Sequence, residues 1–388
     1  MDNQTDDLIT LRADFQAIDQ QMLEMIATRR TLSERIAGWK AKQGFSIRDF
    51  PAEQNRLGFL IEKGKELGLD AFSVSKFYQN FIEDSVMTQN ATLHTLENNG
   101  SIPETPKVAF LGGEGSYSQL AAKKHFSFAN KPISEMGKNS FKASLQAVED
   151  EEADYAVLPF INSTTGLIGD ACDALLESKV SAIGEIFLPI EHCLLGKNWN
   201  YPTGNIKTIY AHPQVFAQCR PFLETLGNAT LIPCDSTTDA LKRVCEGPAN
   251  QAAIGSTVAG NIFGLKVLKS NIHGERQNLT RFLVLSKVPH RVPKQVSAKT
   301  TLALVPKTTP GALSEILLEF SDREITANLL EARPAGHGLW DRVYLIDIEE
   351  RLDCARLDAA LKVIETKTLS LKIIGHYPSA RITSFFGS

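Results

Sequence analysis

Cationic and polar side chains recur in the first ninety residues at spacings that would bring them together on helices. Arg29 and Lys40 are about three helical turns apart, so they share one face and lie about 16 Å apart along its axis. Two long cationic side chains placed this way can converge on one small dianion. Two further pairs are four residues apart and also share a face: Asp49 with Glu53, and Ser85 with Gln89. The alternative is a helical bundle with solvated surface cations, and spacing alone favours it.

The elements that would position these residues are long amphipathic helices. Apolar residues step by three and four from Leu8 to Trp39, and no proline or glycine occurs before Gly38, which predicts a helix of about 30 residues. Such a helix is about 45 Å long, so we expect it to pack against a partner chain. Arg12 is about a quarter-turn out of phase with Arg29, so only an antiparallel second copy would bring it to the same pocket. Shorter helices are predicted near residues 52–67 and 73–96.

Residues 1–97 resemble the all-helical chorismate mutase family. The resemblance rests on Leu11-Arg12, Ile18-Asp19, Arg29-Arg30, Trp39-Lys40, Arg48-Asp49, Glu53 and the string from Ile82 to Gln89. It implies an intertwined helical dimer that converts chorismate to prephenate without a cofactor. By this resemblance Arg29 and the partner's Arg12 clamp the two carboxylates, and Lys40 and Gln89 donate to the ether oxygen. Asp49, Glu53 and Ser85 hold the substrate hydroxyl or orient Lys40. The family usually has Arg where Ala52 stands, so one carboxylate contact is missing.

The central segment alternates short apolar strands with helices, which predicts an α/β fold with a mostly parallel sheet, in one or two lobes. Strands are expected at 107–111, 155–160, 208–211 and 252–254, and helices at 118–125, 141–149 and 238–245. Three polar strings lie between them: 158–166, His212 to Cys219, and Gln277 to Phe282. Each string alone is most simply a strand-to-helix turn with Ser, Thr or Asn caps.

Together, in this order, the three strings resemble prephenate dehydratase over residues 106–288. The resemblance implies two α/β lobes with the site in the cleft between them, acting on prephenate without a cofactor or metal. It makes Thr280 the donor to the leaving hydroxyl. Arg281 either binds a carboxylate or is structural, and four further residues are implied as polar cleft contacts: Asn162, Ser163, Thr164 and Gln218. Two positions depart from the family, which usually has Glu at Ile161 and Ser at Ala211.

The turn from Gly112 to Ser118 resembles a dinucleotide-binding loop only loosely, because the third glycine is missing. A tight turn with open backbone amides at a helix start, able to receive a carboxylate, fits better. Two alternatives stay open. A fused NAD-dependent prephenate dehydrogenase would need an intact glycine loop. A phenylalanine sensor that has lost turnover would be consistent with Ile161 and Ala211.

The last segment reads strand, helix, strand, strand, helix, strand, the ferredoxin-like βαββαβ order. With the strings Thr309 to Leu313 and Leu330 to Pro334, residues 299–378 resemble an ACT regulatory domain. The resemblance implies a phenylalanine pocket at a domain dimer interface, and feedback inhibition by phenylalanine. The family usually has Ser where Ala332 stands. The implied allosteric residues are Gly311, Ala312, Leu313, Glu331, Ala332, Arg333 and Pro334.

Composition limits the class of protein. The chain has 388 residues, 43% hydrophobic and 22% charged, with a net charge of -4. These values predict a multidomain globular protein without broad nucleic-acid or membrane binding. Six scattered cysteines without a C-x-x-C pair suit a cytoplasmic protein and no metal site. We therefore predict a bifunctional, homodimeric or larger enzyme: an all-α mutase domain, a two-lobed α/β dehydratase domain and an α+β ACT domain.

Overall fold

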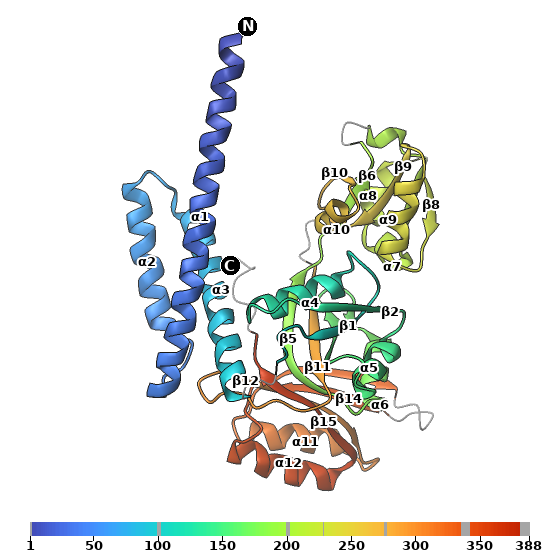
Figure 1. Ribbon diagram of the computed structural model, residues 1–388. Helices are drawn as coiled ribbons and strands as arrows, with labels where there is room; N and C mark the ends of the chain where they lie inside the picture. The colour runs from blue at the N-terminus through green and yellow to red at the C-terminus, as the bar shows by residue number, and fades with distance from the viewer. Residues whose placement is uncertain are drawn as a thin grey trace. The chain divides into compact units, whose positions relative to one another are not determined.

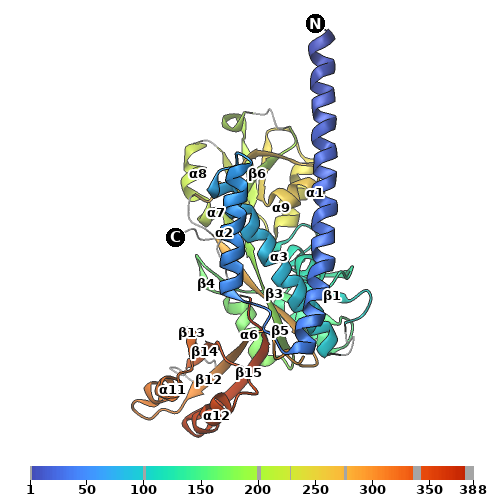
Figure 2. The same cartoon turned by 90° about the vertical axis from the view of Figure 1, so that its left-hand side faces the viewer.

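The computed structural model describes residues 2–98, 102–198, 202–227, 229–274, 278–334 and 342–380, with the side chains of 2–6 left aside. The chain divides into a helical unit, which includes residues 292–296, and an α/β unit that begins at Ile102 (Figures 1 and 2). Gln277, at the start of the third central string, lies outside the described residues.

The helical unit consists of α1 (Asp2–Gln43), α2 (Phe50–Glu66) and α3 (Ala71–Glu97). Helix α1 has 42 residues rather than about 30, because nothing ends it at Gly38. It stops before Gly44, which has the left-handed φ of +75°. Asp49 caps α2 and Asp70 caps α3 through their side chains. Both α1 and α2 pack on α3.

The first lobe of the α/β unit is built on a five-stranded sheet of order β5-β11-β3-β1-β2. Its elements are β1 (Lys107–Leu111), α4 (Tyr117–Ser127), β2 (Ser134–Lys138), α5 (Phe141–Glu149), β3 (Tyr155–Asn162), β4 (Gly166–Leu167), α6 (Gly169–Glu177), β5 (Ser181–Pro189) and β11 (Leu279–Ser286). Strands β1, β2 and β3 are parallel, whereas β11 is antiparallel to both of its neighbours.

The second lobe has a sheet of order β10-β6-β9-β7-β8. Its elements are β6 (Cys193–Gly196), a 3₁₀ turn (Thr203–Asn205), β7 (Thr208–Ala211), α7 (Pro213–Gln218), α8 (Arg220–Thr225), β8 (Thr230–Pro233), α9 (Thr237–Glu246), β9 (Gln251–Gly255), α10 (Thr257–Ile262) and β10 (Lys266–Lys269). The expectation of a mostly parallel sheet is wrong, because both described sheets are mixed. The chain leaves the first lobe after β5 and comes back along β11, which forces antiparallel neighbours.

The remaining elements are β12 (Ala298–Pro306), α11 (Ala312–Ser321), β13 (Ala327–Pro334), β14 (Arg342–Ile348), α12 (Ala355–Lys367) and β15 (Thr368–Pro378). Their strands lie in the order β13-β14-β12-β15, with antiparallel neighbours. Strand β15 then meets β5 of the first lobe at Gly375 and Ala182, so one sheet runs through both parts. A Cβ at Gly375 would lie 2.3 Å from the Ala182 carbonyl oxygen, so only glycine fits there.

Candidate active sites

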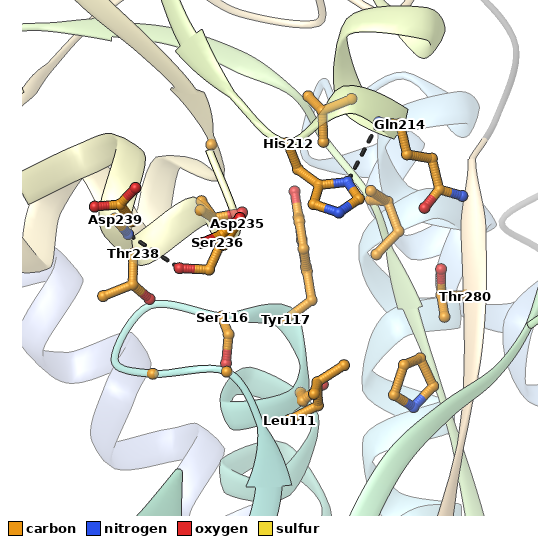
Figure 3. A pocket seen from close by; sticks show the side chains of 18 of the residues that line it. Leu111, Ser116, Tyr117, His212, Gln214, Asp235, Ser236, Thr238, Asp239 and Thr280 are labelled. Carbon is orange, nitrogen blue, oxygen red and sulfur yellow. Dashed lines mark hydrogen bonds between the residues drawn. The ribbon is translucent and has the colours of Figure 1, made fainter. Parts of the chain in front are cut away.

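A cleft of about 960 Å³ opens between the two lobes of the α/β unit. Residues from both sheets line it, and Figure 3 shows Thr280 on one side of the cleft and Asp235 to Asp239 on the other. Its volume lies within the range of small-molecule sites in proteins. Thr238 donates a hydrogen bond of 2.9 Å to the Glu114 carbonyl oxygen, which links the second lobe to the first beside this cleft.

Strand pairing builds the polar centre of the cleft. Strand β11 lies beside β3 with Thr280 opposite Asn162, and both residues are buried. The Asn162 side-chain amide donates to Thr280 Oγ1 at 2.8 Å and to Asn278 Oδ1 at 2.6 Å. Its oxygen accepts from the backbone of Thr164 and Thr165, so the amide is held at both ends. Because Thr280 accepts this bond, its own proton remains available to a molecule in the cleft.

The other expected cleft contacts divide into two groups. Gln218 lines the cleft with Asn162 and Thr280. Ser163 and Thr164 are not among the lining residues, so their expected contacts in the cleft stay predictions. The Ser163 hydroxyl accepts a bond of 2.9 Å from the Leu279 backbone, and the turn brings Thr165 to the cleft instead.

Of the two roles expected for Arg281, the structural one fits, because its guanidinium lies among buried groups and does not line the cleft. Neighbouring residues of a strand point to opposite faces of the sheet, and Thr280 takes the cleft side. Arg281 Nε lies 2.6 Å from Glu185 Oε2, in an ion pair too bent to be a hydrogen bond, and Nη1 is paired with Asp347. Burial favours a lower pKa for Arg281, but Tyr377, Glu185 and Asp347 outweigh it and raise the pKa above its usual value.

The cleft is also lined by a histidine to which the sequence patterns gave no role. His192 Nε2 lies 2.6 Å from Gln218 Oε1, and burial lowers the pKa of His192. Its Nδ1 is buried and has no partner among the described residues. The sequence does contain a feature that points to His192, because this residue belongs to an Ile-Glu-His-Cys string beside β6. A single histidine without a second candidate residue nearby is usually structural, so the string alone did not predict a place in the cleft.

Two helix N-termini also face the cleft. Ser116 caps α4 and Ser236 caps α9, and both serines line the cleft. The free N–H groups and the dipole at a helix N-terminus favour a carboxylate, as expected for the Gly112 turn. At the two family departures, Ile161 packs against the core of the first lobe and Ala211 is fully buried, so neither adds a polar group.

The helical unit gathers a second set of polar residues around Arg29 and Lys40. Arg29 Nη2 donates to the Phe81 carbonyl oxygen at 3.3 Å, while Nε is buried without a partner in the described residues. Burial lowers the pKa of Arg29. Lys40 donates to the Ile47 carbonyl oxygen, and burial lowers its pKa although Asp49 and Glu53 act to raise it. The two carboxylates therefore lie close enough to act on the Lys40 ammonium.

Helix α3 contributes Ser85 and Gln89 to the helical unit's site. Ser85 donates to the Phe81 carbonyl oxygen at 3.0 Å, and Gln89 Nε2 donates to the Ser85 carbonyl oxygen at 3.2 Å. The acceptor Gln89 Oε1 is buried and, like Arg29 Nε, has no partner among the described residues. The donor role expected for Gln89 requires the amide to turn by 180°, which exchanges its oxygen and nitrogen.

Arg12 is exposed on α1 and precedes Arg29 by 17 residues of continuous helix. At 1.5 Å per residue this is about 26 Å along the axis, so one chain does not bring the two guanidinium groups together.

A hollow of about 340 Å³ lies beside α11. Gly311, Ala312 and Leu313 line it together with Arg342 and Tyr344 of β14. The other four implied allosteric residues do not line it: Glu331, Ala332, Arg333 and Pro334. They lie on β13, where Ala332 and Pro334 pair with the lining residues Tyr344 and Arg342. Arg333 forms an ion pair of 2.8 Å with Asp173.

No cluster of metal-ligating side chains occurs in the described ranges. Among the helices of those ranges, none has the length and apolar character needed to cross a bilayer.

Two family models match the sequence: chorismate mutase type II over residues 11–90, and prephenate dehydratase over residues 108–290. A bifunctional chorismate mutase/prephenate dehydratase of Enterobacter agglomerans is 37% identical over 383 residues, covering 98% of each chain. The solved prephenate dehydratase of Arthrobacter aurescens in complex with L-Phe is 28% identical, with a TM-score of 0.62 over 71% of this chain and 90% of that one. The solved structure of GqqA, described as a novel type of quorum quenching acylases, is 29% identical with a TM-score of 0.62, and the match covers 71% of this chain and 98% of that one.

Proposed function

The chain belongs to the bifunctional chorismate mutase/prephenate dehydratase family, and from this premise we propose how its two polar sites divide the work. The helical unit rearranges chorismate to prephenate, and the two-lobed cleft converts prephenate to phenylpyruvate. The bifunctional relative matches 98% of the chain, helical unit included, whereas the acylase matches 71%. The match therefore favours two consecutive reactions over acyl transfer.

The first reaction is unimolecular, so the helical site has to hold the reactive conformer and stabilise charge on the ether oxygen. Arg29 binds one substrate carboxylate through its unpartnered Nε. Lys40 donates to the ether oxygen as the C–O bond breaks, and Gln89 does so after its amide turns. Asp49 and Glu53 oppose the lowering of the Lys40 pKa by burial and so favour its charged form. Ser85 assists through the substrate hydroxyl.

A second copy of the chain completes this site in our proposal. The apolar stripe of α1 is largely exposed, and the exposed fraction of the Phe15 side chain reaches 71%. Its alternating steps of three and four suit a left-handed pairing with another long helix. An antiparallel copy would cover the stripe and bring Arg12 of the partner subunit to the second carboxylate.

The second reaction removes CO₂ and a ring hydroxyl, and the observation that carries it is the buried Thr280–Asn162 pair. The C–C bond to the departing carboxylate breaks, its electrons form the aromatic ring, and the C–O bond breaks. Thr280 donates its proton to the leaving oxygen as the C–O bond breaks, so that oxygen departs as water, and a proton from solvent restores the Thr280 hydroxyl. The N-termini of α4 and α9 hold the carboxylates. Gln218 and His192 form a neutral polar wall beside them.

We propose that residues 299–378 are an ACT-type regulatory domain that binds phenylalanine. Support comes from the order of its elements, from the hollow beside Gly311, Ala312 and Leu313, and from the L-Phe in complex with one structural neighbour. Strand β13 pairs with β14 on one side and is the end strand of the sheet within the described residues. A second copy would pair with its outer edge and bring Glu331 to Pro334 to the domain interface. The first two domains are proposed as residues 1–97 and 106–288. All six cysteines are free thiols, consistent with a cytoplasmic protein.

Phenylalanine is expected to inhibit prephenate conversion in a saturable titration while added prephenate is held constant. The amino acid would order the ACT-type domains, which share a continuous sheet with the catalytic strand β11. Tyrosine at the same concentrations serves as the control. A rate that stays flat across the phenylalanine range would refute this regulation.

Lys40→Ala is expected to lower chorismate consumption by about 10²–10³-fold, the usual effect of removing one donor to a developing oxyanion. Conversion of added prephenate to phenylpyruvate should stay at the level of the unmodified protein, because the cleft lies in the α/β unit. The matched control is Lys42→Ala, which removes an exposed cation two residues further along α1. Loss of both reactions in a folded Lys40→Ala protein would contradict separate sites.

The same assay tests the two alternatives. A prephenate dehydrogenase would reduce NAD when prephenate is added, which absorbance at 340 nm records. A sensor without turnover would consume chorismate but form no phenylpyruvate. Family membership favours neither outcome.

A further inference from the structure

Helix α2 places a further cation beside the residues of the helical site. Arg56 follows Glu53 by three residues and Asp49 by seven, so it lies on the face of α2 that carries both carboxylates. Ala52 is one turn earlier on that face. A methyl side chain at position 52 leaves that stretch of the site without a polar group.

The charge of Arg56 has no acidic counterpart in the described part of the helical unit. Its side chain is exposed, and neither a hydrogen bond nor an ion pair joins it to residues 7–98. Its positive charge acts instead on Arg29, whose pKa it lowers further after burial has done so. Arg29 in turn keeps a buried Nε without a partner. Two neighbouring cations repel each other, and an anion bound between them would offset this repulsion and accept hydrogen bonds from both guanidinium groups.

We propose that Arg56 binds a substrate carboxylate jointly with Arg29, taking over from one turn further along α2 the contact that Ala52 cannot make. The inference rests on the proposed mutase function of the helical unit. Two guanidinium groups from different helices present several N–H donors to one carboxylate, the geometry that favours strong, charge-assisted hydrogen bonds. Positions 52 and 56 are one helical turn apart, about 5.4 Å along the axis of α2. The extended side chain of Arg56 is long enough to reach the space beside Ala52, whose methyl group cannot bind a carboxylate.

The test measures chorismate kinetics in the full-length protein. Arg56→Ala is expected to raise KM for chorismate by about 10–100-fold, the equivalent of losing a hydrogen bond to a charged group. KM for chorismate in Arg56→Lys should lie between the values of the unmodified protein and of Arg56→Ala, because lysine keeps the charge but not the fork of donors. Lys65→Ala, on the opposite face of α2 and paired with Glu62 at the surface, is the matched control and should leave KM unchanged.

A rescue separates a lost substrate contact from a structural defect. Adding Ala52→Arg to Arg56→Ala restores a guanidinium to the same face, so KM is expected to fall back toward its original value. Should Arg56→Ala leave KM unchanged, or the double variant remain as weak as Arg56→Ala, the proposal is wrong. The unmodified protein serves as the separate check, because a protein inactive on chorismate would overturn the mutase assignment itself.

Discussion

Replacing Thr280 with valine is expected to lower kcat for prephenate conversion by about 10²–10³-fold, the usual effect of losing one preorganised donor. Valine keeps the branched shape of threonine and removes only the hydroxyl. The Asn162 amide remains bonded to Asn278 and to the following turn, so the cleft should keep its form. Chorismate should disappear at the original rate, and prephenate should accumulate, as a coupled chromatographic assay would record.

Thr300→Val is the matched control for this substitution. Thr300 is a buried threonine on β12 whose hydroxyl donates to the Glu350 carbonyl oxygen at 2.9 Å, away from the cleft. Both variants lose one buried hydroxyl, so both lose about 1 kcal/mol of stability. Only Thr280→Val should lose turnover. Equal rates in the two variants, measured without phenylalanine, would mean that Thr280 is not the donor.

Thr280 could be predicted as the candidate donor because the string from Gln277 to Phe282 resembles a known family. The face of the sheet to which its side chain points follows from the geometry of a strand. Thr280 and Arg281 are consecutive in a strand, and consecutive side chains point to opposite faces. Once Thr280 is assigned to the cleft, Arg281 belongs on the other side. The sequence alone does not reveal that Glu185 and Asp347 lie there, because they come from strands about 100 and 66 residues away in the chain.

Helices and isolated strands were easier to predict than pairing. The expected strand 107–111 coincides with β1 and the expected helix 141–149 with α5, since both have strong periodicity and clear turn residues. Strands β2 and β5 were missed, because Ser134–Lys138 is polar and Ser181–Pro189 has little alternation. The antiparallel course of β11 depends on how the chain returns from the second lobe, which local patterns do not encode.

Arg281→Met is expected to lower the free energy of unfolding by about 3–5 kcal/mol, the cost of leaving a buried charge without its partner. In the folded chain two cations, Arg281 and Lys299, balance two buried carboxylates, Glu185 and Asp347. Without Arg281 one of these carboxylates is uncompensated. Urea unfolding followed by circular dichroism measures the change. Arg333→Met, which breaks a more exposed pair with Asp173, should cost about 0–1 kcal/mol.

A second substitution tests whether charge balance is the cause. Adding Asp347→Asn to Arg281→Met leaves Lys299 facing Glu185, at 2.9 Å, as a neutral pair. Asparagine still accepts the 2.6 Å hydrogen bond that Thr301 donates to this position. The double variant should therefore regain much of the lost stability, because the carboxylate that Arg281→Met leaves without a cation is replaced by a neutral amide. If it is instead less stable than Arg281→Met, packing of the guanidinium rather than its charge holds β11 to β14 and β15, and the electrostatic account fails.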